Sequence, residues 1–497
     1  MIYNGGMKPD PASRPPLDRS LLIWAICLGA ATLLVYLRTW RFEMLYWDDD
    51  VNVLQNPLVL LPAAEGLKRI FTSIFSTDYY PLTYLSLALD QVLWGGRFVG
   101  YHVTQTLLHS ANVVLVAVLV WRWTGARTAA VLAAAWFAWH PVQVETVAWI
   151  AERKNVLGTC LFLLSWLAYL RADGPPPSPR WRLAALLLFV LAVLSHALVI
   201  VMPALLIVYE IAVRRQPWRE AARRTWLFFV PAAFAAVMRL LGHEQSGQLA
   251  PTFPDAYTAV LTMTKVLGQY LVTLVWPARL SNHYVVQGVT SLADSGPWIT
   301  AAWIALWGLL AWRNAPRRRW ALFAAAWMLV ALAPVLQLVP HPTLRADRYL
   351  YVAALGPMIW IALLGQDLRR PVLPILLGAG SAIALMGATL TRIPDWRDGQ
   401  TLWSDCVAKN PTSAIGHFSL AGWCIAEHRL PDAERHLRES VRYQPDFPEA
   451  EERLGAVLLL EGHTEDARSH LKRALALNPR LIQARQHLAL LPTNAKP

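Results

Sequence analysis

The amino-acid sequence predicts an all-α protein in which a polytopic membrane helix bundle precedes a C-terminal helical solenoid. The bundle is predicted because 56% of the 497 residues are hydrophobic, only 16% are charged, and several apolar runs approach the ~20 residues that span a bilayer. The solenoid is predicted by a repeating pattern beyond residue 392. We expect an N-terminal tail (1–19), a membrane domain (20–392) and a repeat domain (393–497).

Eleven apolar runs are expected to cross the membrane. A twelfth run, Tyr257–Trp276, is expected to lie at the interface or to re-enter, because a crossing there would move later arginine clusters to the opposite side. Leu21–Val35 is expected to be a retained span, since no small-residue cleavage site of a signal peptide follows it. The predicted spans lie near 20–37, 102–121, 128–145, 155–170, 182–196, 198–213, 225–241, 298–312, 320–337, 349–365 and 372–391.

The net charge of +12 indicates membrane topology rather than nucleic-acid binding. Arginines gather in short loops between the apolar runs, as in cytoplasmic loops, and they do not form the basic patch of a nucleic-acid-binding domain. Keeping these loops on one side places the N-terminus in the cytoplasm and the repeat domain outside. The clusters lie near 122–127, 171–182, 214–224, 313–319 and 369–370.

The C-terminal pattern has a period of 34 residues, seen in Pro411, Pro445 and Pro479. Small and apolar residues keep the same phase and a proline closes each unit, which is the signature of tetratricopeptide repeats. Each repeat is expected to be a helix pair that buries its apolar face on the next pair. Such arrays bind peptides or partner proteins. The residues in phase are Leu420, Leu454 and Leu488, Ala421 and Gly455, Ala433 and Ala467, and Leu437 and Leu471.

Three adjacent carboxylates in "LYWDDDVNVLQNPLV" follow the first span on the predicted outer side. One aspartate can cap the helix that follows, but three adjacent ones repel one another. Such repulsion can raise the pKa of one carboxyl, which suits a general base near neutral pH. For Asp48, Asp49 and Asp50 both interpretations stay open, a solvated helix cap and a catalytic base.

A second outer motif, "HPVQVETVAWIAERKN", joins two predicted spans. We expect Glu152 and Arg153 to form a surface salt bridge at the start of a helix. Glu145 has apolar neighbours and no partner nearby in the sequence. Because charged groups at membrane depth are costly and are often functional, Glu145 favours a second outer site, near His140.

Further polar residues lie within or beside predicted spans. His102 and His109 share one helix face, and they either hydrogen-bond a neighbouring helix or line a polar channel. Arg345 and Arg348 in "PTLRADRYLY" lie at a predicted outer interface. They either extend along an aromatic belt or bind phosphate, which the guanidinium group suits. Their outer position, against the general charge bias, favours phosphate.

Outer carboxylates, outer arginines and a lipid-exposed bundle together suit a lipid-linked phosphate donor. The donor's chain would lie in the bilayer, its phosphate would meet the arginines, and its leaving bond would meet the carboxylates. The sequence contains no Walker loop, dinucleotide fingerprint or zinc motif. No cofactor is therefore expected, and a divalent metal at the acidic site stays an open alternative.

The order of the motifs resembles a known family. The resemblance covers about residues 40–495 and is to the transmembrane and tetratricopeptide repeat-containing O-mannosyltransferases and their bacterial relatives. It implies a GT-C superfamily fold in a bacterial inner membrane, with periplasmic repeats that bind a protein acceptor. It also implies inverting transfer of a mannose-like sugar from polyprenyl phosphate, favouring protein hydroxyls as acceptors. The motifs are "WDDDVNVLQNPLV", "GYHVTQTLLHSANV", "HPVQVETVAWIAERKN", "RADRYLY" and "WRDGQTLW", followed by the repeats.

The same resemblance implies roles for the outer acidic residues. Asp48, Asp49 and Asn56 fit the family pattern of the first outer loop, where an acidic residue acts as catalytic base. Asp50 stands at a variable position and is expected to cap a helix or to contact solvent. Glu145 belongs to the second motif and is expected to assist in positioning the acceptor or the donor.

Roles for basic and amide residues follow from the resemblance in the same way. Arg348 matches the arginine before "YLY" and is expected to bind the donor phosphate, with Arg345 and Arg153 as further candidates. The sequence departs from the family pattern at Gln105, where Asn is usual, and at Ser195–His196 (195–196), where Ser-Lys is common. Residues assigned to an acceptor path or polar channel are His102, His109, His140 and Asn56.

Two other functions stay open. A non-enzymatic membrane scaffold would use the repeats to organise an envelope assembly, and it should keep its function when Asp48 and Asp49 are replaced by Asn. A transporter of lipid-linked glycans would be expected to contain an internal inverted repeat, and we detect none in the sequence.

Overall fold

The computed structural model describes residues 18–45, 47–60, 63–75, 79–174, 176–245, 252–338, 340–364, 366 and 372–491. The expected N-terminal tail lies almost entirely outside these residues. The chain divides into two compact units, and the main division, after Pro394, lies close to the expected boundary at 393. The first unit comprises Met1–Met44, Asp49–Leu280 and Gln287–Pro394, and the second comprises Leu45–Asp48, Ser281–Val286 and Asp395–Pro497.

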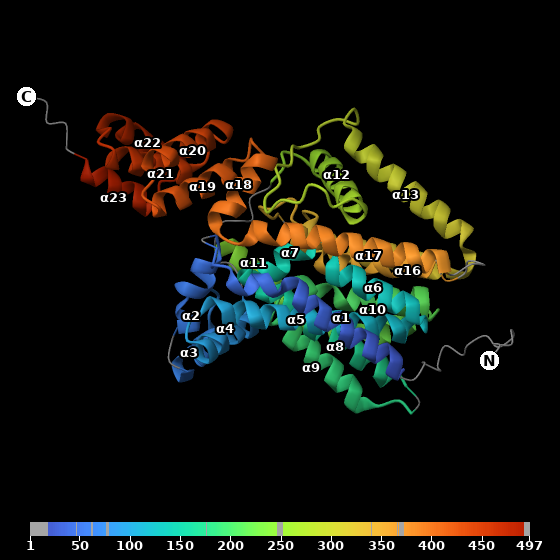
Figure 1. Ribbon diagram of the computed structural model, residues 1–497. Helices are drawn as coiled ribbons and strands as arrows, with labels where there is room; N and C mark the ends of the chain where they lie inside the picture. The colour runs from blue at the N-terminus through green and yellow to red at the C-terminus, as the bar shows by residue number, and fades with distance from the viewer. Residues whose placement is uncertain are drawn as a thin grey trace, which may run out of the picture. The chain divides into compact units, whose positions relative to one another are not determined.

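The first unit is a helix bundle built around α5. This helix packs against α1, α6 and α8, and α17 packs on α6 and α1 (Figure 1). The helices are α1 (Arg19–Tyr36), α2 (Pro57–Leu60), α3 (Ala63–Thr72), α4 (Pro81–Trp94), α5 (Phe98–Thr124), α6 (Arg127–Trp139), α7 (Gln143–Ala148), α8 (Arg153–Ala172), α9 (Pro179–Val193), α10 (Met202–Val208), α11 (Trp218–Gln245), α12 (Ala256–Val275), α13 (Ser295–Arg313), α14 (Arg318–Leu332), α15 (Leu350–Ala353), α16 (Leu355–Leu364) and α17 (Val372–Arg392).

Among the described residues, seven helical segments are long and apolar enough to cross a membrane. An eighth is added if the bent pair Asp347–Ala353 and Leu355–Leu364, with 54° between its halves, is one span. These segments confirm an all-α, multi-pass membrane protein, and the count of eleven stays a prediction. α12 is one of the seven, although the charge pattern predicts that it does not cross. The seven are Arg19–Arg41, Phe98–Thr124, Ile150–Ala172, Trp218–Glu244, Ala256–Val275, Ala315–Val335 and Val372–Trp396.

The third predicted span, expected to continue to residue 145, ends earlier. α6 stops at Trp139 because Pro141 follows His140, and a residue before proline is restricted to extended backbone. His140 accordingly adopts φ −73° and ψ 129°. The short helix α7 then runs separately, which places Glu145 outside the long helices and beside the start of α8.

The packing between α14 and α16 requires a glycine. A Cβ atom built on Gly356 would lie 2.6 Å from the backbone oxygen of Ala324 and 3.0 Å from the Cβ of Trp327. Backbone cannot yield to such a contact without moving a whole helix. The absence of a side chain at Gly356 therefore sets how closely the two helices approach.

The second unit is built from consecutive helices, each packed on the next (Figure 1). Positions in the 34-residue phase supply its core: Ala433 and Ala467 are buried, as are Leu437 and Leu471. The apolar phase therefore corresponds to helix contacts. The helices are α18 (Gly399–Lys409), α19 (Ala414–Ala426), α20 (Leu430–Tyr443), α21 (Pro448–Leu460), α22 (Thr464–Leu477) and α23 (Ile482–Leu490).

Candidate functional site

Asp49 is buried beside the turn that joins α7 to α8. Its side chain is 1% exposed, and its Oδ1 accepts a hydrogen bond of 2.7 Å from the backbone N–H of Ala151. Ala151 lies in the short 3₁₀ turn η3 (Ile150–Glu152). This contact ties the first outer motif to the second, although 102 residues separate the two partners.

The other two aspartates have different surroundings. Asp48 is half-buried and belongs to the second unit. Asp50 is the first residue inside the π-helical turn Asp50–Leu54, so the expectation that it caps a helix is wrong. Its Oδ1 is buried and has no hydrogen-bond partner among the described residues. A buried, unsatisfied oxygen is costly, and this one lies in the segment between α1 and α2.

Glu145 lies in α7, between two candidate spans. Its Oε1 forms an ion pair with Arg348 Nη1 at 2.5 Å. Its Oε2 accepts hydrogen bonds from the backbone N–H groups of Asp347 and Arg348, at 3.1 and 3.3 Å. Burial raises the pKa of Glu145 to about 7, and the guanidinium of Arg348 opposes this rise. Glu145, which has no partner nearby in the sequence, therefore has one 203 residues away.

Arg348 connects Glu145 to a second carboxylate, Glu152. Arg348 Nε lies 3.8 Å from Glu152 Oε1, and Lys154 Nζ lies 3.8 Å from the same oxygen. We call Glu145, Glu152, Lys154 and Arg348 the ion cluster. Glu152 of the ion cluster follows Ala151 directly in η3. The ion cluster and the backbone group that binds the Asp49 carboxylate therefore belong to the same turn.

Aromatic and basic side chains surround the ion cluster. The Arg348 guanidinium lies over the ring of Trp149, 5.6 Å from its centroid. A cavity of about 20 Å³, lined in part by Arg348 and His196, borders the cluster and has room for about one water molecule. Nearby, Arg239 of α11 lies 3.5 Å from the Tyr80 hydroxyl. The Tyr80 ring in turn faces His196, at 5.7 Å between centroids. Cations from several segments thus converge on this end of the bundle.

The expected surface salt bridge between Glu152 and Arg153 is wrong. Arg153 is fully buried and forms an ion pair with Asp90 of α4 at 2.7 Å. Its guanidinium also donates hydrogen bonds to Gln105 Oε1 at 2.7 Å and to the backbone oxygen of Tyr101 at 2.8 Å. Adjacent residues of a helix do not face each other, so the sequence itself already argued against an ion pair between Glu152 and Arg153. The contacts of Arg153 favour a role in bundle packing over one in phosphate binding.

Sequence reasoning missed the place of Glu152, Lys154 and Arg239 in this site. Glu152 and Lys154 flank Arg153 in "AERKN", so the motif itself was a signal. Arg239 lies inside a predicted span, where a charged residue is by itself a reason to expect function.

The histidines predicted on one face of α5 are buried inside the bundle. His109 Nδ1 and the Tyr351 hydroxyl lie 2.8 Å apart in a hydrogen bond. His102 packs edge-on against Phe42, with 6.2 Å between ring centroids. Gln105, on the same helix, donates to the backbone oxygen of Thr146 at 2.8 Å, so it holds α7 in place.

The remaining channel candidates make local contacts. His140 Nε2 forms a hydrogen bond with the backbone oxygen of Leu274 at 3.1 Å. Asn56 is buried, and its Oδ1 accepts from the backbone N–H of Leu58 at 2.9 Å. Asn56 thus caps α2, the function that the sequence suggested for an aspartate.

Arg345 lies in different surroundings from Arg348. It donates to Gln269 Oε1 at 3.3 Å and to Thr273 Oγ1 at 3.0 Å, both on α12. It lines a cavity of about 550 Å³. The two arginines predicted to bind one phosphate therefore face two cavities.

In the part of the chain that the structure describes, no three His, Cys, Asp or Glu side chains lie close enough to hold a metal ion.

Comparisons with known proteins place the chain beside one group of transferases. No family model matches it. It is 24% identical over 485 residues to protein O-mannosyl-transferase TMTC4 of Mus musculus, covering 82% of this chain and 64% of that protein. It is 22% identical over 510 residues to TMTC3 of Homo sapiens, with 90% and 55% covered. The chain thus spans between half and two thirds of the length of these relatives.

Two solved structures also resemble the chain. ArnT from Cupriavidus metallidurans bound to undecaprenyl phosphate has a TM-score of 0.41 and 14% identity, covering 94% of this chain and 77% of that one. The Archaeoglobus fulgidus oligosaccharyltransferase has a TM-score of 0.44 and 14% identity, covering 80% and 57%. The sequence comparison extends over most of the chain. The chain is a distant relative of the protein O-mannosyl-transferases.

Proposed function

We propose that the chain is a membrane glycosyltransferase that moves a mannose-like sugar from a polyprenyl-phosphate donor to an acceptor hydroxyl, favouring protein acceptors. The observation that carries this proposal is the meeting of the buried Asp49 carboxylate and the ion cluster at η3. The distant relationship to protein O-mannosyl-transferases supports the reaction class.

In the proposed reaction, Asp49 accepts the proton of the acceptor hydroxyl. The hydroxyl oxygen attacks the anomeric carbon, the bond from that carbon to the phosphate oxygen breaks, and polyprenyl phosphate leaves with inversion. Arg348 and Lys154 stabilise the charge that develops on the leaving phosphate. Glu145 is a positioning residue, because it holds the Arg348 guanidinium and the backbone beside it. Asp48 stays the second candidate for the base.

The proposed topology has eleven crossings in a bacterial inner membrane, with the N-terminus in the cytoplasm. It leaves α12 at the interface and keeps the arginine clusters on one side. The ion cluster and the second unit are then both periplasmic. The second unit is proposed to be a tetratricopeptide solenoid that binds a protein acceptor, supported by its 34-residue phase and by the consecutive packing of its helices.

The proposal is tested with full-length protein in liposomes, labelled polyprenyl-phosphate sugars and a periplasmic protein extract. Asp49→Asn should lower transfer by about 10²–10⁴-fold without loss of folding, because the amide oxygen can still accept from Ala151. Asp48→Asn tests the second candidate for the base: if Asp49 is the base, this variant should keep its transfer activity. Glu65→Gln is the matched control, since that carboxylate is exposed and pairs with Arg69 in the same helix.

Two outcomes would contradict this assignment. Failure to transfer any sugar of the panel would favour the scaffold. Full activity in both aspartate variants would show that neither Asp48 nor Asp49 is the catalytic base. Chelation with EDTA, followed by addition of Mg²⁺ or Mn²⁺, measures metal dependence. Loss of transfer on chelation that Mg²⁺ or Mn²⁺ restores would indicate a divalent metal at the acidic site.

A further inference from the structure

Arg453 of α21 is the one arginine, among the described residues of the second unit, that is not exposed and forms neither an ion pair nor a hydrogen bond. Arg468, the other half-buried arginine there, pairs with Glu465. Burial lowers the pKa of the Arg453 guanidinium, and the carboxylates of Glu452 and Glu449 oppose this shift without forming an ion pair with it. A guanidinium has five N–H donors, so Arg453 has donors to offer to an acceptor from another molecule.

An aromatic side chain holds the Arg453 guanidinium in place. The guanidinium lies over the ring of Phe418 in α19, 4.1 Å from its centroid. The same ring packs against Phe447, with 4.9 Å between ring centroids. A Cβ atom built on Gly422 would lie 3.1 Å from Arg453 Nη1, so the glycine leaves room beside the guanidinium. An arginine held over a ring by its flat face keeps its N–H edge open to an acceptor. We call Phe418, Gly422, Phe447 and Arg453 the arginine patch.

The arginine patch lies on a face that alternate helices of the second unit share. Ser419 of α19, Arg453 of α21 and His487 of α23 occupy the same position in the 34-residue phase. Arg453 contacts Phe418 of α19, and its neighbour Glu452 pairs with His487 of α23 at 2.7 Å. These contacts connect α19, α21 and α23 directly, so the face extends over three helices (Figure 1).

A carboxylate is the anion that suits this patch. Guanidinium groups bind carboxylates through two parallel hydrogen bonds. One cation with Glu449 nearby matches a single negative charge better than the about −1.5 to −2 of a phosphate monoester. The half-buried rings of Phe418 and Phe447 supply apolar surface beside the cation.

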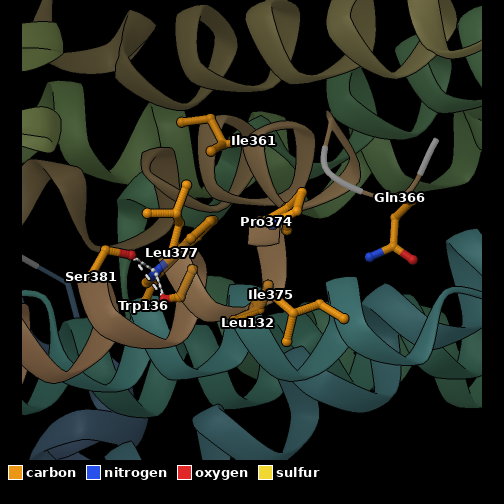
Figure 2. A pocket seen from close by; sticks show the side chains of 10 residues that line it. Leu132, Trp136, Ile361, Gln366, Pro374, Ile375, Leu377 and Ser381 are labelled. Carbon is orange, nitrogen blue, oxygen red and sulfur yellow. Dashed lines mark hydrogen bonds between the residues drawn. The ribbon is translucent and has the colours of Figure 1, made fainter. Parts of the chain in front are cut away.

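The apolar cavity of the first unit in Figure 2 offers no such partner. It lies between α6 and α17, where Trp136 donates to Ser381 Oγ at 3.0 Å, and none of the described residues that line it is charged. A carboxylate there would lose water without gaining a counter-ion, which is costly. The arginine patch supplies both the counter-ion and the apolar contact.

We propose that the arginine patch binds an extended peptide segment in which an aspartate or glutamate lies next to an apolar side chain. The carboxylate pairs with Arg453, and the apolar side chain packs on Phe418 and Phe447. This inference rests on the proposed function in one respect, namely that the segment belongs to the protein acceptor. The second unit then selects acceptor proteins by an acidic segment, separately from the hydroxyl that receives the sugar.

The test is affinity selection of a random peptide library, displayed on phage, with the full-length protein in detergent. The selected peptides should be enriched in Asp or Glu next to Phe, Tyr, Leu or Ile. One selected peptide is then synthesised and its binding is measured by fluorescence anisotropy. Replacing its acidic residue by the amide should weaken binding about tenfold or more, as expected for a charge-assisted hydrogen bond.

Variants of the patch assign the binding to its residues. Arg453→Gln should weaken the acidic peptide about tenfold and leave the amide peptide unchanged, while Arg453→Glu should change the enrichment from acidic to basic residues. Phe418→Leu keeps the cation and should weaken both peptides, and it tests the patch if Arg453→Gln fails to fold. Arg473→Gln is the matched control, because Arg473 is exposed on α22. It should change neither peptide.

Three results would overturn the inference. They are a selection without enrichment of acidic residues, tighter binding when phosphoserine replaces the acidic residue, and acidic enrichment that persists in the Arg453 variants. Peptide binding requires no sugar transfer, so the two proposals fail separately. Binding that depends on Arg453 without transfer to any acceptor would refute the proposed activity alone, whereas normal transfer without acidic enrichment would refute only the peptide site.

Discussion

Replacing Glu145 by Gln tests the central contact of the ion cluster. The amide keeps the size of the side chain, and its oxygen can still accept from the backbone N–H groups of Asp347 and Arg348. What is lost is the ion pair with Arg348. Two unit charges about 4 Å apart interact by about 4 kcal/mol at an effective dielectric of 20, and breaking a buried pair costs about 3–5 kcal/mol. Glu152 still neutralises part of the arginine, so we expect a loss of about 3 kcal/mol.

A double-mutant cycle isolates this pair. The free energy of unfolding is measured by SDS titration in mixed micelles for Glu145→Gln, Arg348→Gln and the double variant. We expect a coupling free energy of about 2–3 kcal/mol, the upper range for residues in contact. The control cycle uses Glu65 and Arg69, an exposed pair in one helix, with an expected coupling of about 0.3–0.5 kcal/mol. If the buried pair coupled no more strongly than this control, Glu145 would not hold Arg348 and the site would lose its organising contact.

Three further predictions follow from individual contacts. Arg153→Met leaves Asp90 buried without its ion-pair partner and should cost about 3–5 kcal/mol in the same titration; unchanged stability with weaker donor binding would instead support a phosphate contact. Sugar transfer should fall as the pH drops below about 7, because protonation of Glu145 removes the charge that pairs with its arginine. A pH–rate profile should lose this inflection in Glu145→Gln, and an inflection shared by both proteins would belong to another group. Gly356→Ala forces a Cβ against the backbone of α14 and should lower the apparent unfolding temperature, at a cost of about 1–3 kcal/mol. Gly380→Ala in α17, which meets nothing within 4 Å, is its control and should not.

The helices were largely predictable because their signals are local. In the part of the chain that the structure describes, most of each expected apolar run is helical, since run length and composition determine a membrane helix without reference to partners. The early end of α6 at Trp139 was also present in the sequence, as Pro141. The apolar run continues past it, and hydropathy alone therefore extends the helix too far.

The candidate site was predictable as a set of residue types but not as a set of contacts. Glu145 and Arg348 were both selected from their motifs, yet nothing in the sequence indicates that they pair across 203 residues. Asp49 was selected together with Asp48, and the structure distinguishes Asp49 by its burial and by its contact with Ala151. The prediction for Arg153 illustrates the difficulty. A cation near such a loop could bind phosphate, but the Arg153 guanidinium forms an ion pair with Asp90 of another helix.

By itself, the sequence determined the helical class, the apolar runs, the 34-residue phase and the acidic and basic residues between the apolar runs. These properties depend on composition and period over a few turns of chain. Only the tertiary structure decided which carboxylate meets which cation, which arginine is buried in the bundle, and which one lines the cavity beside α12. Those outcomes depend on burial and on approach between segments up to about 200 residues apart, where a charge is stable only when the fold brings it a partner.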